Sequence, residues 1–474
     1  MTVNSTTVHR GKPITRVLLV NPDSAAQEGY SNPPLGLAYL AGTLERHGIQ
    51  VRIVDGFLVG RIGIEQAVRE FDPGLVGITC YTPGRTSVID IAKWVKTYRR
   101  DMITVLGGPH ATIMWKQIMI NYQQVDMCVL GEGEQTLLEI VLGTPYAQIT
   151  GVVWRNDDVV TKNLPRKYIE NLDFIPFPAW HLLPLHQYPN RGSGVHNGID
   201  LSIEPRISVV FSRGCSASCS FCSTWWIWRG HRCRSAANMA DELELLNQQH
   251  GFRHIIFADD AFSADMLAAK TLCQEIITRR IKIAWLATTR VDAVDHELLQ
   301  LMRESGCYEI SYGVESGSQR ILDLMGKKAT VQQAKEAIIA TKETGIRATV
   351  LLIVGNEGET SESVNETVDF LNDTDPDNIG SVGGLWIFPG TALYTRAKRE
   401  KLIDDSFWLT DEPIKVYLAE HSEKDLRKYL FAIQSRKKIG SVAFWLAYAI
   451  RLSRSFARKF AIARKIYNRV TRSS

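Results

Sequence analysis

Residues 211–226 read FSRGCSASCSFCSTWW, and three cysteines in this stretch, Cys215, Cys219 and Cys222, decide how the chain is interpreted. Their spacing, three residues and then two, brings three thiolates together in one short loop. Thiolates are the usual ligands of iron-sulfur clusters, and three of them on a four-iron cluster leave one iron open to a small molecule. The stretch therefore predicts a 4Fe-4S cluster that takes part in chemistry.

A structural zinc site is the alternative, but zinc normally takes four protein ligands. Cys233, in the Arg-rich run HRCRS, is the nearest candidate for a fourth ligand. The other cysteines fall in or beside apolar segments, so we interpret them as small buried side chains and expect no second cluster: Cys80, Cys128, Cys273 and Cys307.

The length of 474 residues allows two or three domains. No apolar stretch precedes the first expected strand, so we expect no secretory signal and a cytoplasmic protein with reduced thiols. The formal net charge of +4 arises from the tail, since Leu426 to Ser474 contain 13 Lys and Arg and no Asp or Glu.

The tail also contains the apolar run SVAFWLAYAI at 441–450, followed by basic residues interleaved with apolar ones. The run is about half of the roughly 20 residues that span a bilayer. It favours a basic amphipathic helix lying on the inner, anionic face of a membrane. The alternative is a helix packed on the protein with a solvated basic face. No nucleic-acid motif accompanies the charge, so we expect no nucleic-acid partner.

Residues 14–145 alternate short apolar runs with helical patterns, which is typical of a doubly wound, Rossmann-like parallel sheet. The expected strands are 17–21, 51–55, 75–79, 103–106 and 127–130, and the expected helices are 35–47, 64–71 and 87–98. Ligands of such sheets bind at the carboxyl ends of the strands. Those ends carry residues 21–22, 81–86, 107–112 and 131–134.

A hairpin and a proline-spaced linker are expected over residues 146–205, followed by a second β/α region over 206–402 and a helical region over 403–474. The expected strands of the second region are 207–212, 255–258, 283–287, 309–313, 349–354 and 382–387. Six such repeats, with the cysteine loop directly after the first strand, predict an α/β partial (β/α)6 barrel whose reactive face is the carboxyl rim of its strands.

Motifs in both halves carry a family resemblance. The first half contains NPPLGLAYLAGTLERHG, VLGGPHAT and LGEGE, and the second half contains CSASCSFC, FADDAF, SYGVESGSQRIL, LLIVGNEGET and FPGTALY. Together they resemble the cobalamin-binding radical S-adenosylmethionine (SAM) enzymes over roughly residues 16–401. The segment CSTWWIWRGHRCR is similar to the anaerobic Mg-protoporphyrin monomethyl ester cyclase branch, whereas GVESG and FPGTALY look more like the group that contains radical methyltransferases.

The resemblance implies three cofactors: a 4Fe-4S cluster on the three cysteines, SAM on its open iron, and cobalamin on the N-terminal sheet. In this family, one-electron cleavage of SAM yields an adenosyl radical that takes hydrogen from an unactivated carbon. The resemblance also implies an electron donor such as flavodoxin or ferredoxin.

Candidate SAM contacts follow the barrel strands. Asp259 and Asp260 would accept hydrogen bonds from the SAM ammonium, or else cap a helix that begins near Ser263. Arg290 would hold the SAM carboxylate and Glu315 the ribose, with structural ion pairs as the alternative.

Gly355 would let the backbone approach adenine, and the neighbouring Glu359 would contact SAM or cap a helix. For cobalamin, the resemblance implies contacts from Thr79, Tyr81, Gly107, Gly108, His110, Gly131 and Glu132.

We do not expect His110 to ligate cobalt, because the Asp-x-His-x-x-Gly pattern is absent; it would hydrogen-bond the corrin periphery or pack in its loop. Residues 81–86 would face the lower side of cobalt without a strong ligand.

A Trp and Arg cluster follows the cysteines: Trp225, Trp226, Trp228, Arg229, Arg232 and Arg234. It could line a pocket for an apolar or planar substrate that bears carboxylates or phosphates, or it could form a packed loop over the cluster.

Three functions are compatible with these features. The main hypothesis is radical transfer of a methyl group from methylcobalamin to an unactivated carbon of a biosynthetic intermediate. The alternative is an oxidative cyclase or hydratase of the Mg-protoporphyrin ester cyclase type, without methyl transfer. A non-catalytic cobalamin-binding regulator is the third, and it would not need the three cysteines.

Overall fold

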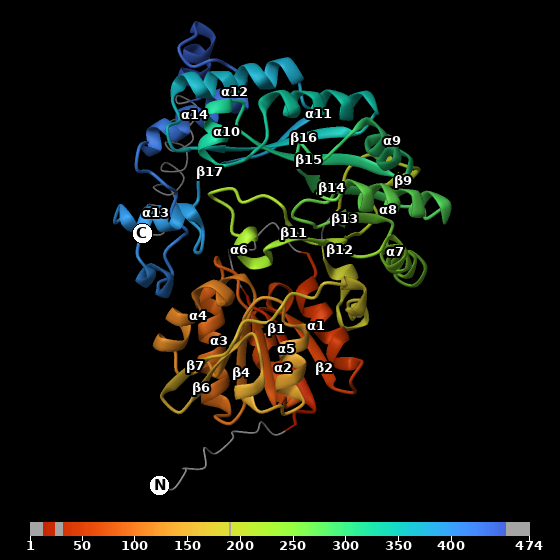
Figure 1. The fold of residues 1–474 in the computed structure, drawn as a ribbon, viewed down its shortest axis with the longest axis vertical. Helices are drawn as coiled ribbons and strands as arrows, with labels where there is room; N and C mark the ends of the chain where they lie inside the picture. The colour runs from red at the N-terminus through yellow and green to blue at the C-terminus, as the bar shows by residue number, and fades with distance from the viewer. Residues whose placement is uncertain (1–12, 24–31, 189–190, 452–474) are drawn as a thin grey trace, which may run out of the picture.

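The computed structural model describes residues 13–23, 32–188 and 191–451 and contains two α/β units (Figure 1). The N-terminal unit is built on a seven-stranded sheet, and the second on a six-stranded sheet. The short strand β11 and helix α6 lie between the two units in Figure 1.

The first five strands of the N-terminal sheet are parallel, as predicted: β1 (Arg16–Asn21), β2 (Gln50–Asp55), β3 (Leu75–Thr79), β4 (Ile103–Gly107) and β5 (Met127–Val129). The connecting helices are α1 (Leu35–Glu45), α2 (Gly56–Phe71), α3 (Arg85–Tyr98), α4 (Pro109–Asn121) and α5 (Glu134–Val141). The strand order is β2-β1-β3-β4-β5-β6-β7, so the chain reverses direction across the sheet between β1 and β3. In doubly wound sheets the ligand crevice opens at this point.

The expected hairpin, β6 (Val152–Asn156) and β7 (Val159–Lys162), is present but is not a separate element. β6 pairs antiparallel with β5, with Met127 opposite Trp154. This pairing covers the edge of β5 and buries Trp154, so the hairpin extends the N-terminal sheet.

The linker packs across both units. It contains the 3-10 turns η3 (Leu172–Phe174), η4 (Trp180–Leu182) and η5 (Leu185–Gln187) and the strand pair β8 (Val195–His196) and β9 (Ile199–Asp200), whereas η2 (Tyr146–Gln148) precedes the hairpin. Ala179 N donates to Ala38 O in α1, and Trp180 Nε1 donates to Glu242 Oε1 at 3.2 Å in α7 of the second unit.

The second sheet is parallel throughout, in the order β10 (Arg206–Val209), β13 (His254–Phe257), β14 (Ala284–Thr289), β15 (Cys307–Glu315), β16 (Arg347–Val354) and β17 (Asn378–Gly384). Its helices are α7 (Ala236–His250), α8 (Met266–Thr278), α9 (His296–Glu304), α10 (Gln319–Leu324), α11 (Val331–Glu343), α12 (Ser361–Thr374) and α13 (Ala392–Arg399). This is the expected partial barrel.

Two strand predictions for the barrel are wrong. The last strand is 378–384, not 382–387, because the apolar residues Leu385 and Ile387 pack against the N-terminal unit instead of filling the barrel. The first strand ends at Val209, and the cysteine loop follows a separate strand, β11 (Ser212–Cys215).

The segment after α13 joins the two units. It includes η6 (Asp405–Leu409), in which Trp408 is buried in one apolar cluster with α3 and α4 of the N-terminal unit. Arg85 of α3 donates to Glu412 O at 2.6 Å, and its guanidinium lies 5.4 Å from the centre of the Trp408 ring.

The chain continues through α14 (Glu423–Ser435), which packs on α12, into a helical segment at 442–451. Within the described residues, no helix is both long and apolar enough to cross a bilayer. Most of the predicted basic tail, residues 452–474, lies outside the described residues.

We expect Trp408→Ala to lower the free energy of unfolding by about 3–5 kcal/mol, because the change leaves a cavity between the two units. Phe174→Ala is the matched control, since Phe174 is 75% exposed and should lose less than about 1 kcal/mol. Chemical denaturation followed by circular dichroism measures both. Equal losses would contradict the joining role of Trp408.

Candidate active site between the two units

The cysteine loop is carried by a small hairpin. β11 pairs antiparallel with β12 (Gly230–Cys233), and α6 (Thr224–Trp228) lies between them. At Gly214, φ is +90° and an added Cβ would lie 2.0 Å from Gly230 O, so only glycine fits before the first cysteine. The loop is held by backbone bonds, from Ser220 N to Met325 O at 2.9 Å and from Leu393 N to Ser220 O at 3.0 Å.

All three cysteines of this loop are free and partly buried. Burial raises the pKa of Cys219, while the nearby cations Lys327 and Arg290 lower it. Burial also raises the pKa of Cys222, against hydrogen bonds from Thr224 that lower it. Cations beside a buried thiol favour the thiolate, which is the form that binds metal.

Within the part of the chain that the structure describes, no three or more His, Cys, Asp or Glu side chains are close enough to hold one metal ion. The three thiols nevertheless share one loop, and Cys215 is near enough to raise the pKa of Cys222. This arrangement fits a cluster, in which each thiolate binds a different iron, better than a single zinc ion.

The predicted residues Arg290 and Glu315 are both in ion pairs, which was the alternative interpretation. Arg290 binds Asp292 through two hydrogen bonds of 2.8 and 2.7 Å, and Glu315 Oε1 lies 2.8 Å from Lys327 Nζ. Arg290 also donates to Lys327 O at 3.1 Å. These four side chains therefore form one polar network beside Cys219.

Lys327 was missed by the sequence analysis, although it is only 5% exposed and faces the cysteine loop. Lys327 follows α10 and a glycine turn, and nothing in this local sequence predicts that its side chain lies at the carboxyl rim of the barrel.

Asp259 is buried and supports the loop that precedes the cysteines. Its carboxylate accepts hydrogen bonds from Phe211 N at 3.3 Å, from Ser212 N, and from Ser212 Oγ at 2.5 Å. Burial raises its pKa to about 7, although these hydrogen bonds lower it. The expected helix cap is wrong, because α8 begins at Met266 and is capped by Asp265.

Asp260 points the other way, into a cavity, where it accepts a hydrogen bond from Thr224 Oγ1 at 3.0 Å. A ligand in this cavity could therefore reach the Asp260 carboxylate. Burial raises the pKa of this group.

The Gly355 turn is closed by the predicted Glu359. Glu359 accepts hydrogen bonds from Gly355 N at 2.6 Å and from Asn356 N at 3.3 Å, whereas α12 is capped by Thr360. Gly355 has φ of +84°, and an added Cβ would lie 2.7 Å from Leu426. The turn is thus packed against α14.

A cavity of about 530 Å³ separates the carboxyl ends of the N-terminal strands from the cysteine hairpin. Six of the seven residues expected to contact cobalamin line it: Thr79, Tyr81, Gly107, Gly108, Gly131 and Glu132. The opposite wall contains Ser212, Arg213, Trp228 and Asp260. The sequence analysis missed Tyr39, Thr112 and Arg213 as lining residues.

The cavity fits a large ligand with a flat face. A Cβ at Gly107 would meet no atom within 4 Å, and Gly108 has φ of +90°, so the backbone is bare at these two positions of the wall. Glu134 Oε2 is buried and has no hydrogen-bond partner among the described residues. Such an acceptor can be satisfied by an amide donor of a bound ligand, and cobalamin carries amides around its ring.

His110 does not line this cavity. Its side chain is 2% exposed, its Nδ1 lies 3.2 Å from Thr82 Oγ1, and its ring contacts Trp408 edge-on. Burial lowers its pKa to about 3, so it is neutral. Of the two expected roles, the structure places His110 in the packing of its own loop.

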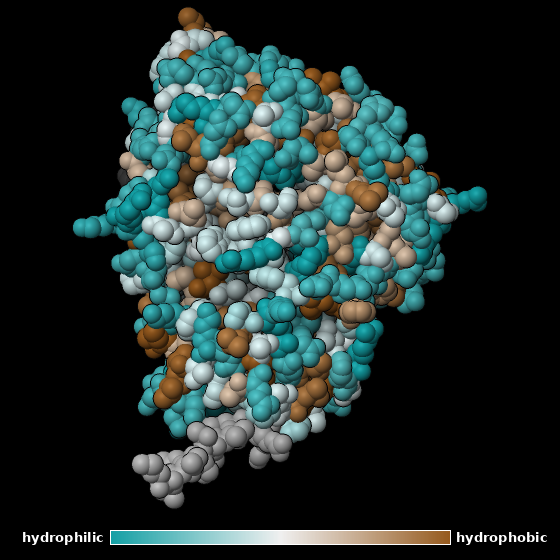
Figure 2. Space-filling model, in the orientation of Figure 1, coloured by the Kyte–Doolittle hydropathy of each residue, from teal (hydrophilic) through white to brown (hydrophobic). Residues whose placement is uncertain are grey.

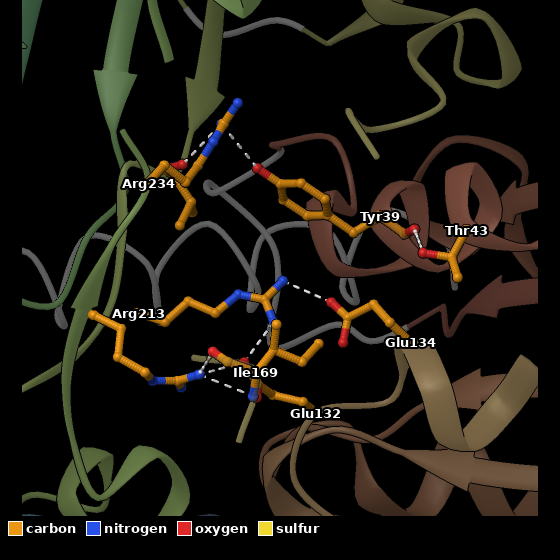
Figure 3. A network of polar contacts seen from close by, with 9 residues as sticks. Tyr39, Thr43, Glu132, Glu134, Ile169, Arg213 and Arg234 are labelled. Carbon is orange, nitrogen blue, oxygen red and sulfur yellow. Dashed lines mark hydrogen bonds and ion pairs between the residues drawn. The ribbon is translucent and has the colours of Figure 1, made fainter. Parts of the chain in front are cut away.

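A buried ion network ties the cavity to the hairpin (Figure 3). Arg213 binds Glu132 at 2.8 Å and Glu134 at 2.6 Å, and Arg232 binds Glu132 at 3.1 Å. The guanidinium of Arg213 lies 5.5 and 5.7 Å from the rings of Tyr39 and Trp228. Glu132 also accepts from Ile169 N at 2.6 Å, so its carboxylate is occupied by protein donors.

The residues of the Trp and Arg cluster therefore have different surroundings. Arg232 binds Glu132 and Arg234 binds the buried Glu242, so neither guanidinium is free for a substrate. Trp228 lines the cavity, and Arg229 stacks on the exposed Trp226 at 5.2 Å from its ring centre. The packed-loop alternative holds for the two paired arginines.

Comparisons with known proteins agree with this geometry. Residues 25–141 match the family model of the B12 binding domain, and residues 209–371 match that of the Radical SAM superfamily. The chain is 32% identical over 446 residues to an uncharacterized methyltransferase of Pyrococcus horikoshii, covering 90% of this chain and 94% of that protein.

It is also 32% identical over 379 residues to the anaerobic magnesium-protoporphyrin IX monomethyl ester cyclase of Rubrivivax gelatinosus, covering 76% of this chain and 66% of that protein. Among solved structures, the fold matches the radical S-adenosylmethionine methyltransferase TsrM of Kitasatospora setae, solved with tryptophan substrate and a SAM analog. The TM-score is 0.66 at 22% identity, covering 81% of this chain and 76% of that one.

We expect Arg213→Met to destabilise the protein by about 3–5 kcal/mol, because the buried Glu134 loses its arginine partner and Glu132 keeps only Arg232. Adding Glu134→Gln should recover part of this loss, since Glu132 still pairs with Arg232 and no buried carboxylate is then without an arginine. Arg279→Met, which removes three surface ion pairs on the barrel helices, is the control and should cost less than Arg213→Met, because these carboxylates stay in contact with water. Thermal melts that show no recovery would contradict the network.

A second prediction concerns pH. Because the pKa of Asp259 is about 7 in the folded protein and about 3.9 when unfolded, the folded state binds the extra proton between these values. The contribution of Asp259 to the free energy of unfolding is therefore greatest at low pH, and it falls by up to about 1.4 kcal/mol per pH unit until pH 7.

Asp259→Asn removes this dependence, so the stability difference between wild type and variant should shrink as pH rises from 4 to 7. Melting temperatures of the two cluster-free proteins test this. A difference that grows with pH would mean that the hydrogen bonds keep the carboxylate ionised despite its burial.

Proposed function

The chain belongs to the cobalamin-binding radical SAM enzymes, and on this premise we propose that it transfers a methyl group to an unactivated carbon of a small biosynthetic intermediate. The observation that carries the proposal is the 530 Å³ cavity, with the glycine-lined ends of the N-terminal strands on one side and the cysteine hairpin on the other. The relative from Pyrococcus horikoshii, a methyltransferase by name, matches over nearly the whole of both chains.

When bound, the 4Fe-4S cluster and SAM supply one-electron cleavage that activates a carbon-hydrogen bond, and cobalamin supplies the methyl group. The chain's own residues hold these groups in place. Cys215, Cys219 and Cys222 would bind three irons, and the cations Lys327 and Arg290 would stabilise the negative charge of the thiolates.

Asp260 would accept a hydrogen bond from the SAM ammonium, because its carboxylate lines the cavity on the side of the cysteine hairpin. Asp259 would act indirectly, by fixing the backbone before the first cysteine. Arg290, Glu315, Gly355 and Glu359 would shape the SAM site from the remaining strand ends.

Weak binding of cobalt by the protein favours release of a methyl group. Among the described residues that line the cavity there is no histidine, cysteine or methionine. Tyr81, which is 49% exposed and lines the same cavity, would face the metal without a strong ligand atom. Thr79, Gly107, Gly108, Gly131 and Glu132 would contact the ring, and His110 would support their loop.

An apolar or planar substrate is favoured by the aromatic side chains near the hairpin. Trp228 lines the cavity, Trp226 is exposed, and Trp386 lies beyond the carboxyl end of β17 with its ring centre 6.1 Å from that of Phe388. We propose as further partners a one-electron donor such as flavodoxin or ferredoxin, and a membrane surface contacted peripherally by the C-terminal region.

Oxidative cyclisation without methyl transfer is the second candidate function, supported by the similarity to the Rubrivivax gelatinosus cyclase. That similarity covers 76% of this chain, against 90% for the Pyrococcus horikoshii methyltransferase. The shorter coverage makes methyl transfer the stronger proposal.

Counting products separates the two functions. Anaerobically reconstituted protein, supplied with SAM, cobalamin, reductant and a candidate substrate pool, should form S-adenosylhomocysteine and 5'-deoxyadenosine together. Mass spectrometry should also find a product heavier by one methyl group. Formation of 5'-deoxyadenosine alone, with an oxidised product, would favour the cyclase function.

Single Cys215→Ala, Cys219→Ala and Cys222→Ala variants should lose the iron-sulfide absorbance and at least about 100-fold of SAM cleavage, because each removes one cluster ligand. Cys233→Ala is the matched control and should keep both. If Cys233→Ala loses iron as well, the fourth cysteine is a metal ligand and the assignment of an open iron is wrong.

A further inference from the structure

The helical segment at 442–451 exposes an apolar face. Its side chains Val442, Trp445, Leu446 and Ile450 are 76, 50, 63 and 52% exposed. Trp445, Leu446 and Ile450 follow Val442 by three, four and eight residues, so the four side chains share one side of the helix. Figure 1 places this segment at the end of the molecule opposite the N-terminal sheet, and Figure 2 shows hydrophobic atoms at that tip.

The other side of the same helix is packed. Phe444 is fully buried, and its ring centre lies 5.6 Å from that of Phe431 in α14 and 5.4 Å from that of Tyr448. Ile439 N donates to Asn365 Oδ1 at 2.7 Å in α12, which fixes the start of the segment. The helix is thus held on the barrel while its outer apolar face is turned away from it.

A helix that is apolar on all sides is normally covered on all sides. Here the described residues cover only the inner side. The outer face therefore requires an occupant that is apolar where it meets Val442, Leu446 and Ile450.

The charge of the following residues indicates which occupant this is. Residues 451–474 contain eight Lys and Arg and no Asp or Glu: Arg451, Arg454, Arg458, Lys459, Arg464, Lys465, Arg469 and Arg472. A surface that is both apolar and strongly anionic complements an apolar face continued by a basic chain. An anionic lipid bilayer has both properties, and it attracts each basic residue that lies near its surface.

We propose that the helix at 442–451 lies in the interface of an anionic membrane, with Val442, Trp445, Leu446 and Ile450 toward the lipid tails and the basic residues from Arg451 onward against the headgroups. This identifies the lipid class and the contact residues of the peripheral contact proposed above, on which it rests. It is independent of methyl transfer, because the segment is separated from the cavity by α12, α14 and the barrel sheet.

Sedimentation with vesicles tests the inference on the full-length, reconstituted protein. Two vesicle types are compared, pure phosphatidylcholine and a mixture in which about a third of the lipid is phosphatidylglycerol. We expect the protein to pellet with the anionic vesicles at low salt, with binding to neutral vesicles weaker by at least about tenfold and reduced by high salt.

The triple variant Val442→Asp, Leu446→Asp, Ile450→Asp should lose at least about tenfold of this binding, while its melting temperature and SAM cleavage stay near wild type. Leu267→Asp is the matched control, because Leu267 is 75% exposed on α8 and should have no effect on pelleting. Replacing the seven basic residues after Arg451 by Gln should abolish the preference for anionic vesicles.

Other occupants give other results, and each overturns the proposal. A wild-type dimer that becomes monomeric in the triple variant would assign the face to a second copy of the chain. Stronger pelleting with neutral vesicles after removal of residues 452–474 would mean that this segment covers the face. Failure of the wild type to bind anionic vesicles, with SAM cleavage intact, would reject the membrane contact and leave the reaction unaffected.

Discussion

Two buried carboxylates, Glu132 and Glu134, are neutralised by arginines of the hairpin that carries Cys215. Charges so deeply buried are tolerated only when they are paired, so the N-terminal sheet and the hairpin constrain each other's position. The position of Cys215, two residues beyond Arg213, therefore depends on the loop that follows β5. The arrangement links the N-terminal wall of the cavity to the cysteine hairpin through two arginines, Arg213 and Arg232.

This constraint explains how the chemistry can be shared between two units. The glycine-rich strand ends leave bare backbone on one wall, and β11 and α6 supply the other wall. The segment around Trp408 makes another contact between the same two units, through Arg85 and the apolar cluster of α3 and α4. The hairpin and the Trp408 segment are thus two separate contacts that hold the units on either side of the cavity.

Buried ion pairs also change the interpretation of residues that the sequence had suggested for substrate binding. Arg232 and Arg234 lie in a run of aromatic and basic residues, yet each belongs to a buried ion pair. Arg290 and Glu315 likewise have protein partners, Asp292 and Lys327. Positive and negative charges beside Cys219 are thus balanced within the protein. Asp260 lines the cavity, whereas its buried neighbour Asp259 binds the backbone before Cys215.

The sequence by itself determined the three thiolates, the parallel strands of both sheets and the glycine turns at the cobalamin wall, because spacing, alternation and glycine are local properties that the chain carries with it. It could not determine that the hairpin at 152–162 joins the first sheet, that Leu385 and Ile387 leave the barrel, or that Lys327 returns to Cys219. Nor could it place His110 behind its loop or pair Arg213 with Glu132 across 81 residues. Those outcomes depend on which charges and apolar surfaces meet after folding, and only the tertiary structure decides which partner each of them finds.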